Sequence, residues 1–301
     1  MCGRYASARK RIELLEEFRV ERDRVTEPLD PDYNVAPTKP VYAVLARAPR
    51  VPGAPMEPGT PRASGTPTEP GAPRDAEPGN GRGGARPGGA LPGGATRELR
   101  VVRWGLVPSW AKDPAIGGRL INARAETVDS RPAFRKPFAK RRCLLPADGY
   151  YEWQPAATGP RTVKQPYYIS RRDGAPLAMA GIYELWRDRA LPDDHERAWL
   201  WTAAIITTSA PDELGRIHDR MPMIIEKDRW ADWLDPASDD PADLRALLAP
   251  AAAGGLAWHP VSTAVNSVRH NGPELIETIE PGDAAAGPAG RAGSAGRAGG
   301  R

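Results

Sequence analysis

Cysteine, histidine and long apolar runs are all scarce in this chain of 301 residues. It has only two cysteines, Cys2 and Cys143, and its four histidines do not stand at the short spacing from them that is typical of a zinc site. No stretch of about 18 apolar residues indicates a membrane span. No apolar core follows the early basic residues Arg4 and Lys10 as it would in a secretory signal. We therefore expect a cytoplasmic protein without metal or other cofactor, in which the cysteines stay reduced.

Hydrophobic periodicity is missing from residues 48–96, where 23 of 49 residues are Gly or Pro. Such a segment cannot bury enough apolar surface to offset the entropy lost on ordering. The tail 281–301 has the same character, with arginines between Gly and Ala. We expect both to be disordered, and we expect one folded domain made of residues 1–47 and 97–280. An insertion of this kind belongs in a loop between strands, because closure entropy grows slowly with loop length.

The charge balance permits a polyanion partner without requiring one. The formal net charge is +4, from 42 Lys and Arg against 38 Asp and Glu. A small overall excess does not say whether the arginines gather on one face, so the local pattern must decide.

The remaining sequence predicts an α+β fold. Residues 9–24 have Ile12, Leu15 and Phe18 at helical spacing, which predicts an amphipathic helix. Further helices are expected near residues 131–140, 212–217 and 228–234. Runs rich in apolar, β-branched and aromatic residues predict strands within 40–46, 99–110, 121–128, 143–154, 165–172, 177–186 and 198–208. The expected architecture is a mixed, largely antiparallel sheet or barrel with flanking helices.

Cys2 directly follows Met1, so removal of one residue places a cysteine at the amino terminus. Its α-amine (pKa roughly 7.7 to 8.0) and its thiol (pKa about 8.5) then form a 1,2-aminothiol. Such a pair condenses with an aldehyde, because the amine gives an imine and the thiol closes a thiazolidine ring. The alternative is a chance residue or a small buried apolar one.

Several stretches supply side chains suited to chemistry on an anionic substrate. Asn122 can donate and accept hydrogen bonds, Glu152 can act as general acid or base, and His218 can transfer protons near pH 7. Three arginines offer forked cations that match phosphate: Arg4, Arg124 and Arg220. Two tryptophans, Trp104 and Trp110, can stack on unpaired bases. Each residue taken alone also has a structural reading: an internal ion pair, a structural histidine, a solvated face, or core packing.

The chain resembles the SRAP family (SOS response-associated peptidase) in seven stretches that occur in the family's order. They are MCGRYA, PDYNVAPT, RWGLVPSWAKDPAIGGRLINARAET, CLLPADGYYEW, MAGIYELW, TTSAPDELGRIHDRMPMII and VSTAVN. They cover nearly all of the chain outside residues 48–96 and the tail. The resemblance implies a single SRAP-like domain with a basic groove, which reacts covalently with abasic sites in single-stranded DNA during the response to DNA damage.

The resemblance also implies roles for particular residues. Met1 is removed with the help of the protein's own site, and Cys2 forms a thiazolidine with the ring-opened sugar. Asn122 holds that sugar, while Glu152 and His218 move protons. The DNA strand is bound by Arg4, Arg124, Arg220 and a hydroxyl from Thr207 or Thr208, with Trp104 and Trp110 as candidate stacking residues. An imine that the thiol does not capture leads to strand cleavage by β-elimination, so weak lyase activity is expected.

Two other functions remain open on the residues alone. The first is a thiol-dependent peptidase or amidohydrolase with Cys2 as nucleophile, which would turn over rather than consume itself. The second is a noncovalent single-strand-binding module, whose salt-sensitive binding would survive loss of the thiol. We expect a monomer that acts on single-stranded DNA containing abasic sites.

Overall fold

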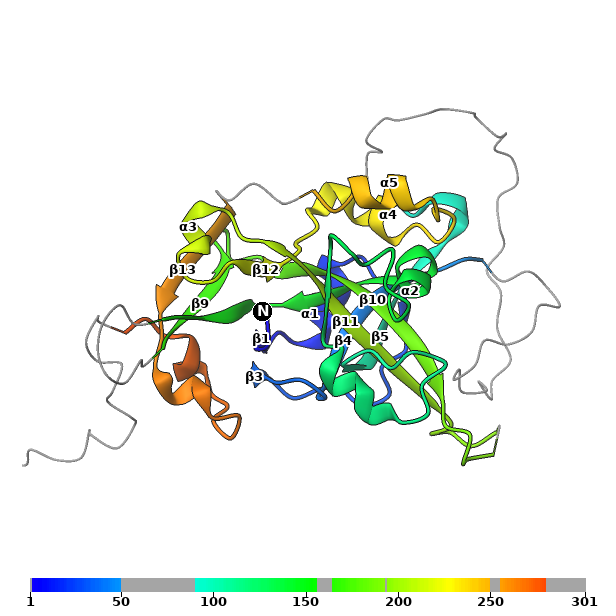
Figure 1. The fold of residues 1–301 in the computed structure, drawn as a ribbon, viewed down its shortest axis with the longest axis horizontal. Coiled ribbons are helices and arrows are strands. Elements are labelled where there is room, and N and C mark those ends of the chain that lie inside the picture. Colours follow the sequence, from blue (N-terminus) through cyan, green and yellow to red (C-terminus); the bar gives the residue numbers. More distant parts are fainter. Residues whose placement is uncertain (1, 50–89, 156–163, 193, 250–254, 280–301) are drawn as a thin grey trace, which may run out of the picture.

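The structure, a computed structural model, describes residues 2–49, 90–155, 164–192, 194–249 and 255–279. Within these ranges two β-sheets lie side by side, with short helices around them (Figure 1). None of the helices in the described part of the chain is both long and apolar enough to cross a bilayer.

Five strands of the larger sheet close into a barrel. They are β4 (Pro40–Arg47), β5 (Thr96–Trp104), β7 (Arg142–Ala147), β10 (Leu177–Arg187) and β11 (Trp199–Ser209). Their order is β11, β10, β7, β4, β5, and a parallel pairing of β5 with β11 completes the ring. The other four pairings are antiparallel. Three short strands extend the sheet along β5 and β11: β2 (Arg22–Asp23), β6 (Asn122–Arg124) and β12 (Arg220–Pro222).

The second sheet is antiparallel throughout and brings the two ends of the folded chain together. Its order is β13 (Leu256–Pro260), β9 (Gln165–Arg171), β8 (Gly149–Gln154), β1 (Tyr5–Ser7) and β3 (Asp32–Val35). Gly149 stands where the chain passes from β7 into β8. A Cβ there would lie 2.4 Å from the Tyr168 ring and 2.6 Å from the carbonyl of Ile169, so the close approach of β9 requires glycine.

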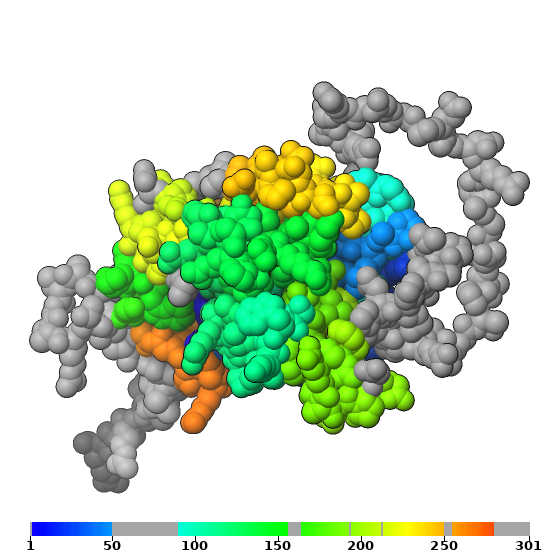
Figure 2. All heavy atoms as spheres, turned by 45° about the vertical axis from the view of Figure 1, so that its right-hand side comes forward, coloured from blue at the N-terminus to red at the C-terminus, as the bar shows by residue number. Residues whose placement is uncertain are grey.

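Short helices contribute to the apolar clusters on both faces of the barrel strands. The α-helices are α1 (Arg11–Glu17), α2 (Arg135–Lys140), α3 (Asp212–Gly215), α4 (Trp230–Leu234) and α5 (Pro241–Ala246). The 3₁₀ turns are η1 (Pro92–Gly94), η2 (Pro114–Arg119), η3 (Lys227–Arg229), η5 (Thr263–Asn266) and η6 (Pro273–Ile276). In the space-filling view the α4–α5 region (gold) and the C-terminal segment 255–279 (orange) lie at opposite edges of the visible face (Figure 2).

The alternation of side chains along the barrel strands produces two apolar layers. Val44 and Leu144 belong to the layer that packs on Phe18 of the α1 C-cap and Trp233 of α4. The neighbouring side chains point the other way, into a layer that also contains Cys2. Cys2 therefore belongs to the core between the barrel and the second sheet, together with Tyr5 and Tyr150 of β1 and β8.

The structure confirms the predicted α+β class, with its mixed and largely antiparallel sheets. The helix expected within 9–24 is shorter, and its buried face differs from the one predicted. Leu14 and Phe18 are buried and four residues apart, and Phe18 stacks on Trp230 with ring centroids 4.6 Å apart. This orientation leaves Ile12 56% exposed, so its assignment to the buried stripe is wrong.

The low-complexity insertion connects two paired strands. β4 and β5 pair along their whole length, from Pro40 opposite Arg103 to Arg47 opposite Thr96. The expected boundary at residue 97 is too late, because Leu91 and Ala95 are already buried against the core. Residues 50–89 and the tail from residue 280 lie outside the described residues, and their predicted disorder stays a prediction.

Candidate active site

Four parts of the chain meet beside the junction of the two sheets. Cys2 precedes β1, and Glu152 lies on β8, which pairs with β1. Asn122 begins β6, which pairs with β11, and His218 lies between α3 and β12. Because β12 also pairs with β11, the strand pairings bring residues more than 200 positions apart to one place.

Asn122 is hydrogen-bonded to the residue that carries the thiol. Its Nδ2 donates to the carbonyl oxygen of Cys2 at 2.7 Å. Its Oδ1 is buried and has no hydrogen-bond partner among the residues that the structure describes. Asn122 thus fixes the main chain of Cys2 and keeps an acceptor available beside it for a hydroxyl group of a ligand.

The thiol of Cys2 is free and fully buried. Burial raises its pKa well above the usual value, and the nearby carboxyl group of Glu152 acts in the same direction. The sulfur is therefore a neutral thiol at pH 7, and it needs a base before it can attack. Burial also raises the pKa of Cys143 on β7, which lies inside the barrel.

Glu152 is only 4% exposed, and its environment prepares it for proton transfer. Desolvation raises its pKa from 4.5 to about 7. Near neutral pH the carboxyl group is populated in both its protonated and ionised forms. One group can therefore give a proton in one step and accept one in the next.

The Nε2 atom of His218 is the ring nitrogen that faces Glu152. This atom lies 4.0 Å from the Glu152 Oε2, while the Nδ1 of His218 accepts the backbone N–H of Arg220 at 2.9 Å. Partial burial lowers the pKa of the ring, so it is neutral at pH 7 with its proton on Nε2. The Asp219 Oδ1 lies 3.0 Å from Nδ1 and is the partner for a second proton when the ring becomes charged.

The three predicted phosphate-binding arginines have different surroundings. Arg124 is exposed at the end of β6. Arg4 is half-buried and donates through Nη1 to the side chain of Asn34 at 2.6 Å. Arg220 forms a two-pronged ion pair with Glu126, at 2.7 and 3.1 Å. Only Arg124 faces solvent openly in this conformation, and a continuous basic groove stays a prediction.

Thr207 and Thr208 lie on β11 where it pairs with β12, and both are almost fully buried. The Nη2 of Arg220 donates to the carbonyl of Thr207 at 2.6 Å and lies 3.4 Å from its hydroxyl. Thr207 therefore belongs to the wall of the site that holds Arg220, whereas the part of Thr208 stays a prediction.

The structure separates the two candidate stacking residues. Trp104 is fully buried, its ring lies 5.1 Å from that of Tyr5, and its Nε1 donates to the carbonyl of Ile121. The expectation that Trp104 contacts DNA is wrong, because both ring faces are covered by the core. Trp110 is 60% exposed and lines a surface cavity with Lys112 and Arg119, so the core reading is wrong for Trp110.

Two polar residues close to the site were missed in the sequence. Asn34 and Glu126 are the partners of Arg4 and Arg220. Both stand inside the stretches that carry the family resemblance, yet nothing in their spacing indicates which arginine each one meets. Within the described ranges, no group of three or more His, Cys, Asp or Glu side chains is arranged to hold a metal ion.

Comparison with known proteins gives a consistent result. The model of the family "SOS response associated peptidase (SRAP)" matches residues 1–268. The chain is 33% identical over 278 residues to the abasic site processing protein YoqW of Bacillus subtilis, covering 92% of this chain and 100% of the relative. It is 38% identical over 209 residues to the abasic site processing protein HMCES of Gallus gallus, covering 62% and 59%. A crystal structure of a protein from Bacteroides thetaiotaomicron matches the fold, with a TM-score of 0.65 at 24% identity over 93% of this chain and 100% of that one.

Proposed function

The chain belongs to the SOS response associated peptidase family, and from this we propose that it captures abasic sites of single-stranded DNA covalently through Cys2, once Met1 has been removed. The observation that carries the proposal is the grouping of Asn122 and Glu152 around the buried thiol. The relatives named abasic site processing proteins support the same substrate.

The proposed reaction has two bond-forming steps. The α-amine of Cys2 adds to the aldehyde carbon of the open sugar, and loss of water gives an imine. The nitrogen of this imine carries a proton. The sulfur then adds to the imine carbon, the C=N bond becomes the single bond of a neutral ring N–H, and the thiol proton passes to a base. The product is a thiazolidine that joins protein and sugar, with one water released per cross-link.

The pKa values support this order of events. An α-amine with a pKa of roughly 7.7 to 8.0 is partly neutral at pH 7, whereas burial keeps the Cys2 thiol protonated. The amine is thus the first nucleophile. Protonated Glu152 assists departure of the hydroxyl group as water, and the resulting carboxylate accepts the thiol proton. His218, with its proton on Nε2, stabilises that carboxylate.

The strand itself is held by contacts that ignore base identity. Arg124 faces solvent and binds a phosphate, Arg4 contributes its remaining N–H groups, and Arg220 exchanges Glu126 for a phosphate. The hydroxyl of Thr207 lies 3.4 Å from Arg220, and a hydroxyl from Thr207 or Thr208 contributes to the same contact. Trp110 stacks on a base beside the two cations of its cavity. Specificity comes from the aldehyde, and an abasic nucleotide is less costly to extrude than a complete one.

The proposal includes two further reactions of the same site. The first is removal of Met1 by the protein itself, which makes it a self-processing peptidase that acts once. The second is slow strand cleavage by β-elimination from an imine that escapes ring closure. We propose that the protein works as a monomer in the cytoplasm, where it joins the nucleoid by binding DNA.

Intact-mass analysis tests the proposal directly. The protein is measured before and after mixing with a single-stranded oligonucleotide that carries one abasic site. We expect a chain without Met1, and then a denaturant-stable adduct with the mass of both partners less one water. An oligonucleotide with no abasic site gives no adduct.

Two matched variants assign the chemistry. Cys2→Ala keeps an α-amine but has no thiol, so it forms only a hydrolysable imine, while Cys143→Ala behaves like the parent protein. A stable adduct from Cys2→Ala would refute the thiazolidine. Binding without any adduct favours the noncovalent module, and repeated release of peptide products favours the hydrolase.

A further inference from the structure

Asn34 is a fully buried amide that connects three separate parts of the chain. It lies on β3, and its Oδ1 accepts a hydrogen bond from Arg4 at 2.6 Å. Its Nδ2 lies within donating distance of three main-chain oxygens, those of Val265 at 3.2 Å and of Ser267 and His270 at 3.0 Å. One side chain therefore ties the segment 265–270 to β3 and to the residue before β1.

Arg4 is fixed at both its side chain and its main chain. Its Nη1 also donates to the carbonyl of Val265 at 2.7 Å, and its own carbonyl accepts the N–H of Tyr151 at 2.9 Å. The guanidinium lies 5.9 Å from the centroid of the Trp153 ring. Arg4 follows Cys2 by two residues, and its backbone amide acts on the Cys2 thiol in the direction that lowers the pKa. The placement of Arg4 thus sets the placement of the thiol.

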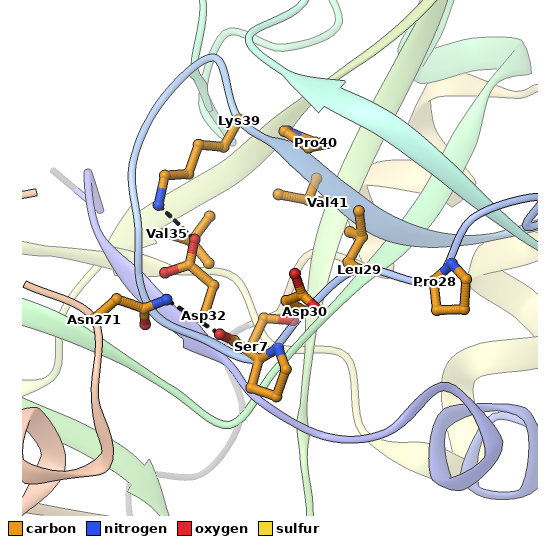
Figure 3. A pocket seen from close by; sticks show the side chains of 11 residues that line it. Ser7, Pro28, Leu29, Asp30, Asp32, Val35, Lys39, Pro40, Val41 and Asn271 are labelled. Carbon is orange, nitrogen blue, oxygen red and sulfur yellow. Dashed lines mark hydrogen bonds and ion pairs between the residues drawn. The ribbon is translucent and has the colours of Figure 1, made fainter. Parts of the chain in front are cut away.

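Asn34 is itself supported from the side that faces solvent. Its N–H donates to the Asp32 Oδ1 at 2.8 Å, and Lys39 bonds both the carboxylate of Asp32 and the carbonyl of Asn34. Figure 3 shows Lys39 and Asp32 meeting on the wall of a surface pocket, with Asn271 beside Asp32. Buried polar groups that satisfy one another in this way hold a single arrangement, because breaking one bond leaves its partner unsatisfied.

We propose that Asn34 is a positioning residue for covalent capture: its buried amide holds the Arg4 side chain, and through Arg4 it holds Cys2 against Asn122. This inference rests on the proposed function and adds a residue that touches neither DNA nor the reacting atoms. Asn34 acts on the rate of the covalent step, since misplacing a reacting group by about 1 Å costs on the order of 100-fold in rate.

The first test compares two variants at saturating abasic single-stranded DNA. We expect Asn34→Ala to slow adduct formation on the order of 10- to 100-fold, with a smaller change in the dissociation constant for an intact strand. Asn34→Asp keeps an oxygen for Arg4 but loses the donor to the segment 265–270, so it should retain most of the rate. The matched control is Asn271→Ala, because Asn271 directly follows this segment and accepts a hydrogen bond from the N–H of Tyr33 rather than from Arg4.

A double-mutant cycle tests the route through Arg4. If Asn34 acts through this arginine, the rates of Arg4→Ala and of Arg4→Ala with Asn34→Ala are the same. Full additivity of the two losses would overturn the proposal, and so would equal slowing by Asn34→Ala and Asn271→Ala. Melting temperatures of all variants identify any loss that comes from unfolding.

A second readout needs no DNA. It therefore tests the positioning role of Asn34 separately from the proposed capture of abasic sites. The rate at which a small disulfide reagent modifies Cys2 is measured against that of Cys143 in the same molecule, because both thiols are fully buried. We expect Asn34→Ala to raise the relative reactivity of Cys2, and Asn271→Ala to leave it unchanged. This result stands even if no adduct forms with DNA. Unchanged reactivity in Asn34→Ala would reject the positioning role by itself.

Discussion

At the residue scale, burial sets the protonation states of the two acidic groups in the site. It keeps the Cys2 sulfur as a thiol and brings the pKa of Glu152 to about 7. A thiol that ionised freely in water would be easily oxidised, whereas this one loses its proton only when a base is beside it. The cost of this arrangement is the burial of a carboxylate, and that cost depends on pH.

The stability of the protein should therefore respond to the charge on Glu152. Its pKa is about 7 in the folded protein against 4.5 ordinarily, so the folded state binds the proton more tightly. The free energy of unfolding therefore falls as the pH rises from about 4.5 to about 7 and above. We expect Glu152→Gln to remove this loss, so that the variant gains stability relative to the parent between about pH 5 and about pH 8. Denaturant titrations at several pH values measure the difference, and parallel curves would contradict it.

The pair of Arg220 and Glu126 makes a second prediction about charge. Glu126 occupies two N–H groups of the arginine, so it competes with a phosphate for them. We expect Glu126→Gln to bind intact single-stranded DNA more tightly and to steepen the salt dependence by about 0.7 in the logarithmic slope, the value for one more phosphate contact.

Fluorescence anisotropy over a series of salt concentrations measures both quantities. Glu16→Gln on α1 is the control, because it removes the same charge from an exposed position away from the site. Equal effects of the two substitutions would mean that only net charge matters.

The sequence indicated the candidate reactive residues more readily than the residues that hold them. Cys2, Asn122, Glu152 and His218 have side chains whose chemistry points to a site, and the structure brings them together. Asn34 could not be predicted in this way, because its partners lie up to 236 positions away and the pairing depends on the finished fold. The sequence could not distinguish the buried Trp104 from the exposed Trp110 either, because a tryptophan side chain suits both a core and a stacking surface.

At the scale of elements, β4 and β5 form a hairpin that does not depend on its long connection. The strands are paired up to Arg47 and Thr96, and the side chain of Pro49 lies 3.4 Å from where a Cβ of Gly94 would stand. We expect deletion of residues 50–89 to leave adduct formation unchanged. Loop closure then becomes easier by at most about 1 to 2 kcal/mol.

Thermal unfolding and adduct yield measure the result of this deletion. A longer deletion that also removes Leu91 and Ala95 is the informative comparison, because these side chains are buried. We expect it to lower the melting temperature. A loss of folding in the shorter deletion would show that the connection is part of the core.

The interior of the barrel gives a prediction about packing between β7 and β10. A Cβ on Gly181 would lie 2.8 Å from the sulfur of Cys143 and 3.0 Å from the side chain of Leu145. We expect Gly181→Ala to destabilise the protein by about 1 to 3 kcal/mol, the usual cost of overpacking a core. Adding Cys143→Ala should restore part of the loss by removing the sulfur.

Denaturant unfolding of the single and double variants measures this coupling. Gly255→Ala is the control, because a Cβ there meets none of the described residues within 4 Å. If the double variant were no more stable than Gly181→Ala, the contact with Cys143 would not be the cause of the loss.

The long strands were predictable because each is a long run of apolar, β-branched and aromatic residues, and the early helix because its apolar residues stand at helical spacing. β10 and β11 each span 11 residues, and their apolar and aromatic content marks them as strands. The strands β1, β6 and β12 have only three residues each, which is too short for any period. These short strands carry or flank the site, so the sequence predicted the scaffold more fully than the assembly of the site.

At the scale of the whole molecule, the site depends on contacts between the two ends of the folded chain. Arg4 is bonded to Val265, and a third apolar cluster joins Ala6 of β1 to Val265 and Leu275. The residues that directly follow Cys2 are thus held by a segment more than 250 residues later in the chain. The family model ends at residue 268, within this segment.

Two truncations should therefore have opposite results. A chain that ends at residue 279 keeps every described contact, and we expect its melting temperature and adduct rate to equal those of the full chain. A chain that ends at residue 262 loses Val265, with the carbonyl that accepts from Arg4, and Leu275 from the apolar cluster. The truncation exposes that cluster and leaves the half-buried guanidinium of Arg4 with one partner fewer. We expect the free energy of unfolding to fall by several kcal/mol. Thermal unfolding and intact mass with abasic DNA compare the two. Full activity in the shorter chain would mean that residues 263–279 only cover the site.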